Sequence, residues 1–283
     1  LDNQERYPVV YMLDGEINFS SGTLGGVRQA AQSGEIPEFI AVGIPNTDRG
    51  KDIFPEKVTY HDGTSDGGRA NEFLAFIETE LIPTIESEYR TERYRVLYGT
   101  SNTGFTAVYG LFHSPALADT VIAASATLGV PSFQRSLETT VRAFPGGRHR
   151  LILVMGERDL PTVVSLNGAL AETVAMAAPA GLTCRLAVIR DGDHVPVTSL
   201  AEGLRLAFDG WRLTERLAED TFAELSARAD ASGARFGVPV RIAEDALREL
   251  AGSLLSGKKP APAVEVARHW SATYPGSADA QVA

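Results

Sequence analysis

Short apolar runs alternate with stretches of helical periodicity from the start of the chain to about residue 213. The apolar runs are rich in Val, Ile and Leu and lack in/out alternation, which predicts strands buried on both faces of a parallel sheet. These runs lie at residues 7–13, 39–44, 94–98, 120–126, 150–155 and 186–189. Helical spacing predicts helices over 73–85, bent at Pro83, and over 103–111. The alternation predicts an α/β fold with a mostly parallel sheet covered by helices on both faces.

The pattern changes after Trp211-Arg212-Leu213, where the chain becomes rich in Ala, Leu, Arg and Glu and shows no strand-like run. We expect an α/β domain over residues 1–213 and a small helical tail over 214–283, with helices at 241–255 and 263–274. The tail resembles a single tetratricopeptide repeat, although such repeats normally stack in threes or more. Its apolar stripe must be buried against the main domain, a second copy of the chain (a homodimer) or a protein partner. The stripe consists of Leu247, Leu250, Leu254, Val266 and Trp270.

Composition narrows the function classes. The 283 residues are 44% hydrophobic and 22% charged, with a net charge of −10 and a pI near 5.1. This acidic balance argues against a nucleic-acid partner, which favours a basic face. No stretch approaches the ~20 apolar residues of a membrane-spanning helix. Cys184 is the single cysteine and no His/Asp/Glu cluster has ligand spacing, so we expect no intramolecular disulfide, no metal and no cofactor.

The sequence leaves the location of the protein open. The sequence begins at Leu1 without a methionine and shows no signal-peptide pattern. We therefore expect a processed or trimmed chain, and the cytoplasm, the periplasm and secretion all stay open as its location.

One hexapeptide has the form of a nucleophile turn. Gly99-Thr100-Ser101-Asn102-Thr103-Gly104 follows a predicted strand and opens a predicted helix, which is the context in which G-x-S-x-G raises a serine hydroxyl above a sheet. Thr103 occupies the place of the second glycine, and Gly104 follows it. The motif predicts Ser101 as a nucleophile, while a Gly/Ser/Asn turn without chemistry is the alternative on the hexapeptide alone.

Downstream residues supply a candidate acid and base in the order typical of α/β-hydrolases. Asp159 and Glu157 follow one predicted strand, and His194 follows the next in a Gly/Asp-rich loop. A serine hydroxyl needs an adjacent imidazole to take its proton, and the imidazole needs a carboxylate to fix its tautomer. We predict His194 as the base and Asp159 as the acid, with Glu157 as the alternative acid. The other four histidines are expected to be structural or solvent-facing: His61, His113, His149 and His269.

The first predicted strand ends in the turn Asp14-Gly15-Glu16. A turn at this place in the sheet can aim backbone N–H groups at the oxyanion of a reacting ester. We predict the backbone N–H groups of Glu16 and Asn102 as the oxyanion hole. An ordinary Asp-Gly turn is the alternative.

Several ordered motifs together resemble the Putative esterase family of α/β-hydrolases over about residues 6–213. They are YPVVYMLDG, IPNTDRGKDIFP, FIETELIPTIESEY, YGTSNTGFTAVYGLFHSP and GDHVPV. The family includes feruloyl esterases, S-formylglutathione hydrolases, mycolyltransferases and siderophore trilactone esterases, the last group being the most similar. The resemblance implies an α/β-hydrolase fold, Ser101 as nucleophile, His194 as base and the Asp14 turn as part of the oxyanion hole. Thr103 departs from the family's usual glycine, and the strands that usually precede YPVVYMLDG are missing, so we expect a smaller sheet.

These features favour a serine hydrolase that cleaves small-molecule carboxylic esters through an acyl-serine intermediate. An acyltransferase using the same triad is one alternative. The other is a hydrolase-fold binding protein with little turnover, a class that Thr103 favours.

Overall fold

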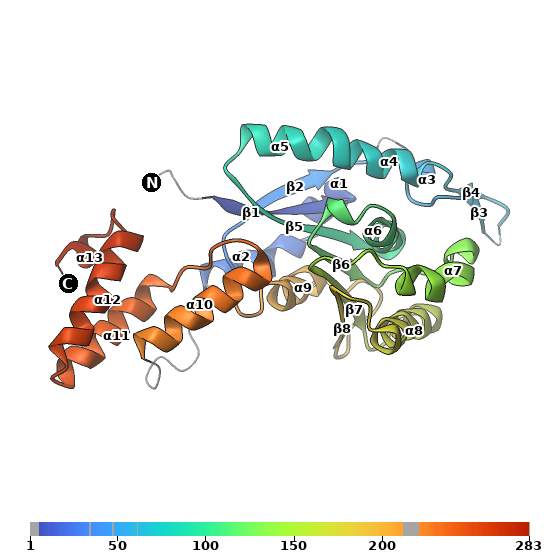
Figure 1. The fold of residues 1–283 in the computed structure, drawn as a ribbon. Coiled ribbons are helices and arrows are strands. Elements are labelled where there is room, and N and C mark those ends of the chain that lie inside the picture. Colours follow the sequence, from blue (N-terminus) through green and yellow to red (C-terminus); the bar gives the residue numbers. More distant parts are fainter. Residues whose placement is uncertain (1–5, 34, 47, 61, 212–220, 283) are drawn as a thin grey trace. The chain divides into compact units, whose positions relative to one another are not determined.

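The chain forms two structural units in a computed structural model that describes residues 6–33, 35–46, 48–60, 62–211 and 221–282 (Figure 1). The first unit spans Arg6–Ala207, and the second begins at Phe208 and continues to the end of the chain. The domain boundary predicted at residues 213/214 lies within 212–220, outside the described residues.

A six-stranded sheet, in the order β2-β1-β5-β6-β7-β8, forms the centre of the first unit, and every pairing in it is parallel. The strands are β1 (Tyr7–Leu13), β2 (Ile40–Ile44), β5 (Thr91–Thr100), β6 (Thr120–Ala124), β7 (His149–Gly156) and β8 (Leu182–Ile189). The predicted parallel sheet is thus confirmed. Strand β8 is longer than its apolar run and alternates in exposure, because it lies at an edge of the sheet. A short antiparallel pair, β3 (Val58–Thr59) and β4 (Ser65–Asp66), lies outside this sheet.

Helices cover both faces of the sheet (Figure 1). Those of the first unit are α1 (Gly15–Ser20), α2 (Thr23–Gln32), α3 (Arg49–Asp52), α4 (Ala70–Phe76), the π-helix η1 (Ile77–Leu81), α5 (Ile82–Glu88), α6 (Ser101–His113), the 3-10 helix η2 (Pro115–Leu117), α7 (Pro131–Arg142), α8 (Pro161–Ala177) and α9 (Ser199–Ala207). Helices α4 to α8 share one apolar core with the sheet, whereas α2 packs on α9 at the other face. Within the described ranges, no helix has both the length and the apolar character needed to cross a membrane.

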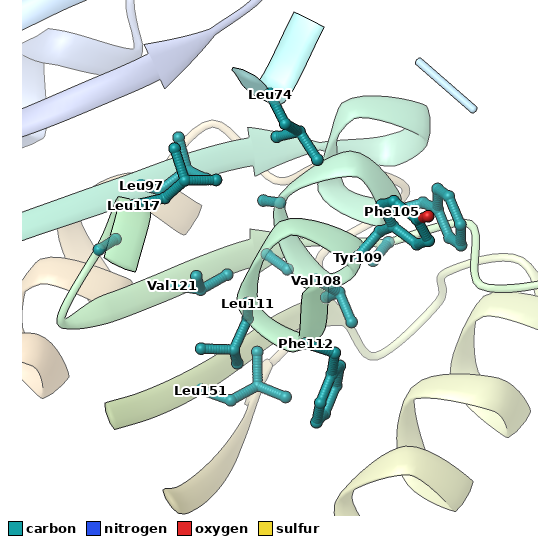
Figure 2. Packing of buried hydrophobic residues seen from close by; sticks show 14 of the residues in the cluster. Leu74, Leu97, Phe105, Val108, Tyr109, Leu111, Phe112, Leu117, Val121 and Leu151 are labelled. Carbon is teal, nitrogen blue, oxygen red and sulfur yellow. The ribbon is translucent and has the colours of Figure 1, made fainter. Parts of the chain in front are cut away.

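Helix α6 is the buried helix that carries the candidate nucleophile at its first residue. Ten consecutive residues, Thr103–Phe112, are buried. Figure 2 shows Leu97, Val121 and Leu151 of neighbouring strands beside the apolar side chains of α6. Burying a large apolar side chain contributes about 1.5–3 kcal/mol, so this packing holds α6 firmly on the sheet. The amino terminus of α6 is thereby fixed at the carboxyl edge of the sheet.

The helix predicted over 73–85 is interrupted. A turn of π-helix, η1, separates α4 from α5, and Pro83 lies at the start of α5. Proline has no N–H and its ring crowds the carbonyl four residues earlier, so a continuous α-helix through Pro83 would be strained. The wider π turn before it replaces the simple bend that the sequence predicts.

The second unit is helical, as predicted for the tail. It contains α10 (Phe222–Phe236), α11 (Glu244–Ser256), α12 (Pro260–Thr273) and α13 (Ala278–Val282). Leu247, Leu250, Val266 and Trp270 of the predicted apolar stripe are buried in this unit's own core, with Leu225 of α10. The stripe therefore has a partner within its own unit that the sequence pattern did not identify. The tetratricopeptide resemblance stays a prediction.

Candidate active site

The residues predicted to carry chemistry follow the carboxyl ends of β1, β5, β7 and β8, which are parallel strands of one sheet. Ligands of open α/β sheets bind at this edge. Several residues at this edge, Ser101 among them, adopt a left-handed backbone conformation that residues other than glycine disfavour. Among the described non-glycine residues with positive φ, five lie at this edge: Asp14, Ser101, Ser125, Asp191 and Val195. Such strain costs on the order of 1–3 kcal/mol per residue and clusters at functional sites. The surrounding fold therefore holds this edge in a defined, strained geometry.

Ser101 lies in a sharp turn between β5 and α6, with φ of 51°. The turn requires a glycine two residues earlier, because a Cβ at Gly99 would lie 2.2 Å from the carbonyl oxygen of Thr103. This is the strand–turn–helix context predicted from the sequence. Ser101 is only partly buried and lies at the amino terminus of α6, where the N–H groups of the first turn have no acceptor inside the helix.

Ser101, His194 and Asp159 form one hydrogen-bonded chain. The Oγ of Ser101 lies 3.0 Å from Nε2 of His194, and Nδ1 of His194 lies 2.7 Å from Oδ1 of Asp159. The Asp159 side chain is fully buried, whereas the imidazole is 32% exposed. A proton on Nδ1 that is donated to the carboxylate leaves Nε2 free to accept the serine proton. The structure thus brings together three residues that the sequence predicts from separate segments.

Glu157, the alternative acid, is exposed and contacts a different group. Its Oε2 accepts a hydrogen bond of 3.0 Å from the backbone N–H of Asp191. The neighbouring Arg158 pairs with Asp191 and Asp193 at 3.3 and 3.1 Å. These contacts join the turn after β7 to the loop that carries His194.

Comparison with known proteins identifies the family. A family model described as Putative esterase matches residues 2–178, which is more than half of the chain. The chain belongs to this family. Its fold and its family support a hydrolase that acts on esters. A search of curated proteins found no match.

Solved structures agree with this assignment. An IroE-like serine hydrolase from Shewanella oneidensis is 26% identical with a TM-score of 0.80, over 96% of this chain and 91% of that one. The siderophore hydrolase EstA from Aspergillus nidulans is 19% identical with a TM-score of 0.61, covering 74% and 83%. Ferric enterobactin esterase from Salmonella typhimurium is 19% identical with a TM-score of 0.56, covering 74% and 52%. At their lower identity, the last two show the fold alone.

The esterase contains one residue at this site that the sequence analysis did not single out. Ser125 is fully buried after β6, and its Oγ donates a 2.5 Å hydrogen bond to Oδ2 of Asp159. The same Oγ accepts a 2.9 Å hydrogen bond from the backbone N–H of Val195. Ser125 therefore contacts both the candidate acid and the residue that follows the candidate base. The apolar run predicted at 120–126 includes Ser125, whereas β6 ends at Ala124. A polar residue near the carboxyl end of this apolar run is the signal that could have identified it.

The predicted oxyanion donors lie in the first turns of two helices at this edge, Glu16 in α1 and Asn102 in α6. Their strands, β1 and β5, are neighbours in the sheet. The side chain of Asn102 is occupied elsewhere, since its Oδ1 accepts a 2.6 Å hydrogen bond from Thr127. The N–H of Thr127 also donates to the carbonyl oxygen of Ser101 at 3.1 Å. These two bonds fix the turn that carries the backbone N–H of Asn102.

A polar wall formed by Tyr60, Asp66 and Asn102 lies beside the nucleophile turn. The Tyr60 hydroxyl donates a 2.9 Å hydrogen bond to Asp66 and lies 3.5 Å from Nδ2 of Asn102. Burial, together with the bond to Asp66, raises the pKa of Tyr60 above its usual value. Tyr60 thus remains a neutral phenol that presents a polar group beside Asn102, the residue after Ser101.

The other described histidines have partners away from Ser101. His113 stacks on Tyr109, His149 contacts the carbonyl oxygen of Ala118, and His269 packs against Phe222. His61 lies outside the described residues. Among the residues that the structure describes, no group of three or more His, Cys, Asp or Glu side chains is placed to hold a metal ion.

Proposed function

We propose that the chain is a serine carboxylic-ester hydrolase that acts through an acyl-serine intermediate on Ser101. The observation that carries this proposal is the hydrogen-bonded chain from Ser101 through His194 to Asp159, at 3.0 and 2.7 Å. The same three residue types in this geometry recur on unrelated folds that share acyl-transfer chemistry.

In the acylation step, the Oγ of Ser101 attacks the ester carbonyl carbon while Nε2 of His194 takes the hydroxyl proton. The resulting imidazolium is stabilised by the buried Asp159 carboxylate, which keeps its negative charge. His194 then gives the proton to the leaving alkoxide as the carbon–oxygen bond breaks. The products are an alcohol and the acyl ester of Ser101.

In the deacylation step, His194 takes a proton from water, and the hydroxide that forms attacks the acyl carbon. The proton returns to Oγ of Ser101 as the acid leaves, so the enzyme is regenerated. In both steps, negative charge develops on the carbonyl oxygen. We propose that the backbone N–H groups of Asn102 and Glu16 stabilise this oxyanion, because first-turn N–H groups are available and point along a favourable helix dipole.

For the substrate, a siderophore-type ester is the class that we propose. The sequence motifs are most similar to those of siderophore trilactone esterases, and two of the fold neighbours are named as a siderophore hydrolase and an enterobactin esterase. The polar wall of Tyr60, Asp66 and Asn102 offers hydrogen-bonding groups to the polar groups of such an ester.

A panel of short-chain, aryl and catechol-type lactone esters tests this function. We expect hydrolysis of activated esters with an initial burst of the alcohol, because the acyl-enzyme forms before it is cleaved. A catechol-type lactone should give the highest kcat/KM of the panel. Added alcohol acceptors should leave the yield of free acid unchanged, whereas a shift to ester products would show an acyltransferase. Absence of turnover with every ester would favour a binding protein and contradict the proposal.

Removing the Ser125 hydroxyl is expected to impair the acid–base pair. Ser125→Ala leaves one Asp159 oxygen and the Val195 N–H without their shared partner. A hydrogen bond to a charged group contributes ~1.5–3 kcal/mol, so kcat/KM should fall about 10- to 100-fold. Ser136→Ala is the matched control, because Ser136 is an exposed helical serine of α7 whose hydroxyl contacts only helix carbonyls. An equal kcat/KM for both variants would show that Ser125 does not support the triad.

A further inference from the structure

A buried carboxylate lies in the turn that carries one of the proposed oxyanion donors. Asp14, the residue after β1, is 1% exposed. Its Oδ1 accepts hydrogen bonds from Nδ2 of Asn46 at 2.6 Å and Nε of Arg49 at 2.8 Å. Its Oδ2 accepts from Nη2 of Arg49 at 3.1 Å and from Oγ1 of Thr103 at 2.9 Å. A buried charge needs both a countercharge and satisfied hydrogen bonds, and here Arg49 supplies the countercharge.

Thr103 is the residue that departs from the G-x-S-x-G pattern, and its side chain is the link between this carboxylate and the nucleophile turn. It is fully buried in the first turn of α6. Besides contacting Asp14, its Oγ1 accepts a 3.1 Å hydrogen bond from the backbone N–H of Thr100. The carbonyl oxygen of Thr100 lies 2.9 Å from the same hydroxyl, but an ionised carboxylate is the stronger acceptor. Glycine at this position could form none of these bonds.

The second glycine of the G-x-S-x-G pattern allows the helix to pack closely on the sheet. In this chain the residue after Thr103, Gly104, has that role. A Cβ at Gly104 would lie 3.1 Å from both Cα and Cβ of Ala126, a tight contact. Gly104 therefore allows the close contact between α6 and the segment that follows β6, so residue 103 can carry a side chain.

Asp14 also shapes the turn that leads to Glu16. Its φ of 51° turns the chain from β1 into α1, and its carbonyl oxygen accepts hydrogen bonds from Ile17 and Asn18. The next residue, Gly15, packs so closely on β2 that a Cβ would lie 2.5 Å from the carbonyl carbon of Gly43. The turn is thus held against β2 by the close packing of Gly15. It also contacts α6, through the hydrogen bond between the Asp14 carboxylate and Thr103.

We infer that Thr103 is a positioning residue, whose hydrogen bond to Asp14 sets the distance between the two backbone N–H groups of the oxyanion hole. One donor, Asn102, precedes Thr103 in the nucleophile turn, and the other, Glu16, lies two residues after Asp14. The Thr103–Asp14 bond joins these two segments through their side chains. This inference rests on the proposed function, because an oxyanion hole has a role only if Ser101 attacks an ester.

The kinetic signature of this role differs from that of a residue that only stabilises the fold. The negative charge on the oxyanion develops in the transition state, so misplaced donors lower kcat and leave substrate binding intact. A displacement of about 1 Å in a catalytic group can cost ~100-fold in rate. Loss of the bond should therefore reduce kcat with little change in KM.

The test compares four full-length variants with the wild type in steady-state kinetics, with rates expressed per active site titrated with a fluorophosphonate. Thr103→Val keeps the side-chain shape but removes the hydroxyl, and its kcat should fall roughly 10- to 100-fold with KM nearly unchanged. Thr103→Ser restores the hydroxyl and should recover most of kcat. Asp14→Asn and the Thr103→Val/Asp14→Asn double variant complete a mutant cycle. The free-energy loss in kcat of the double variant should be smaller than the sum of the losses of Thr103→Val and Asp14→Asn.

Thr120→Val is the matched control, because Thr120 is a fully buried threonine at the start of β6, away from the carboxyl edge of the sheet, and its hydroxyl hydrogen-bonds with that of Tyr94 at 2.6 Å. Its kcat should equal that of the wild type. A Thr103→Val enzyme with wild-type kcat, or a Thr103→Ser enzyme as slow as Thr103→Val, would overturn the inference and leave the proposed function intact. A wild-type enzyme that is folded but hydrolyses no ester would instead overturn the proposed function, and this inference with it.

Discussion

Ser101→Ala is expected to lower kcat for ester hydrolysis by several orders of magnitude, on the order of 10⁶-fold, as for other triad serines. The alanine has no oxygen to attack the carbonyl, and His194 then has no proton to accept. The fold should persist, because alanine keeps the Cβ and tolerates the same backbone as serine at this partly buried position. Steady-state kinetics and a thermal melt of both proteins check the expectation.

Ser87→Ala provides the control for this substitution. Ser87 is an exposed serine of α5 whose hydroxyl contacts the carbonyl oxygen of Thr84, so its loss should change neither the rate nor the melting temperature. Retention of more than a small fraction of activity in Ser101→Ala, at undiminished thermal stability, would show that another group is the nucleophile.

Asp159→Asn is expected to reduce kcat by about 10⁴-fold, because an amide can donate to Nδ1 of His194 and so favours the wrong imidazole tautomer. The substitution also removes the negative charge that stabilises the imidazolium. Glu157→Gln is the matched variant two residues earlier in the same turn. The Glu157 side chain is exposed and accepts its hydrogen bond from the backbone N–H of Asp191 rather than from His194. The kcat of Glu157→Gln should therefore stay near that of the wild type.

The two variants together distinguish the candidate acids. A large loss in Glu157→Gln with a small loss in Asp159→Asn would assign the acid to Glu157 and would contradict the hydrogen bond between His194 and Asp159. Comparable losses in both would indicate that the loop as a whole, rather than one carboxylate, supports His194.

The sequence predicted the strands of the sheet more reliably than its helices. The run at 7–13 matches β1 at both ends, because a buried central strand is apolar throughout. Strand β8 was found only in part, since an edge strand is half exposed and its apolar pattern is weak. Helix α10 was not predicted individually, and the π turn before Pro83 depends on a hydrogen-bond shift that periodicity does not reveal.

Site residues could be predicted from the sequence where each follows a predicted strand and where their order along the chain, serine then acid then histidine, is that of α/β-hydrolases. Ser101, Asp159 and His194 are of this kind, and the structure brings them into hydrogen-bond contact. The choice between Asp159 and Glu157 required the geometry, because both follow β7. Ser125 and the Thr103–Asp14 bond could not be predicted in the same way, since each joins residues that are distant in sequence through a single side-chain contact.

The measurement that tests the nucleophile assignment most directly is covalent labelling with a fluorophosphonate, followed by mass spectrometry of the tryptic peptides. Cleavage after Arg95 and Arg135 yields one peptide, Val96–Arg135, which carries Ser101 together with Ser114, Ser125 and Ser132, so fragmentation must locate the adduct. The assignment of Ser101 as the nucleophile predicts one adduct per chain, on Ser101, and none in Ser101→Ala. An adduct on another residue, or no adduct on a folded wild-type protein, would contradict it.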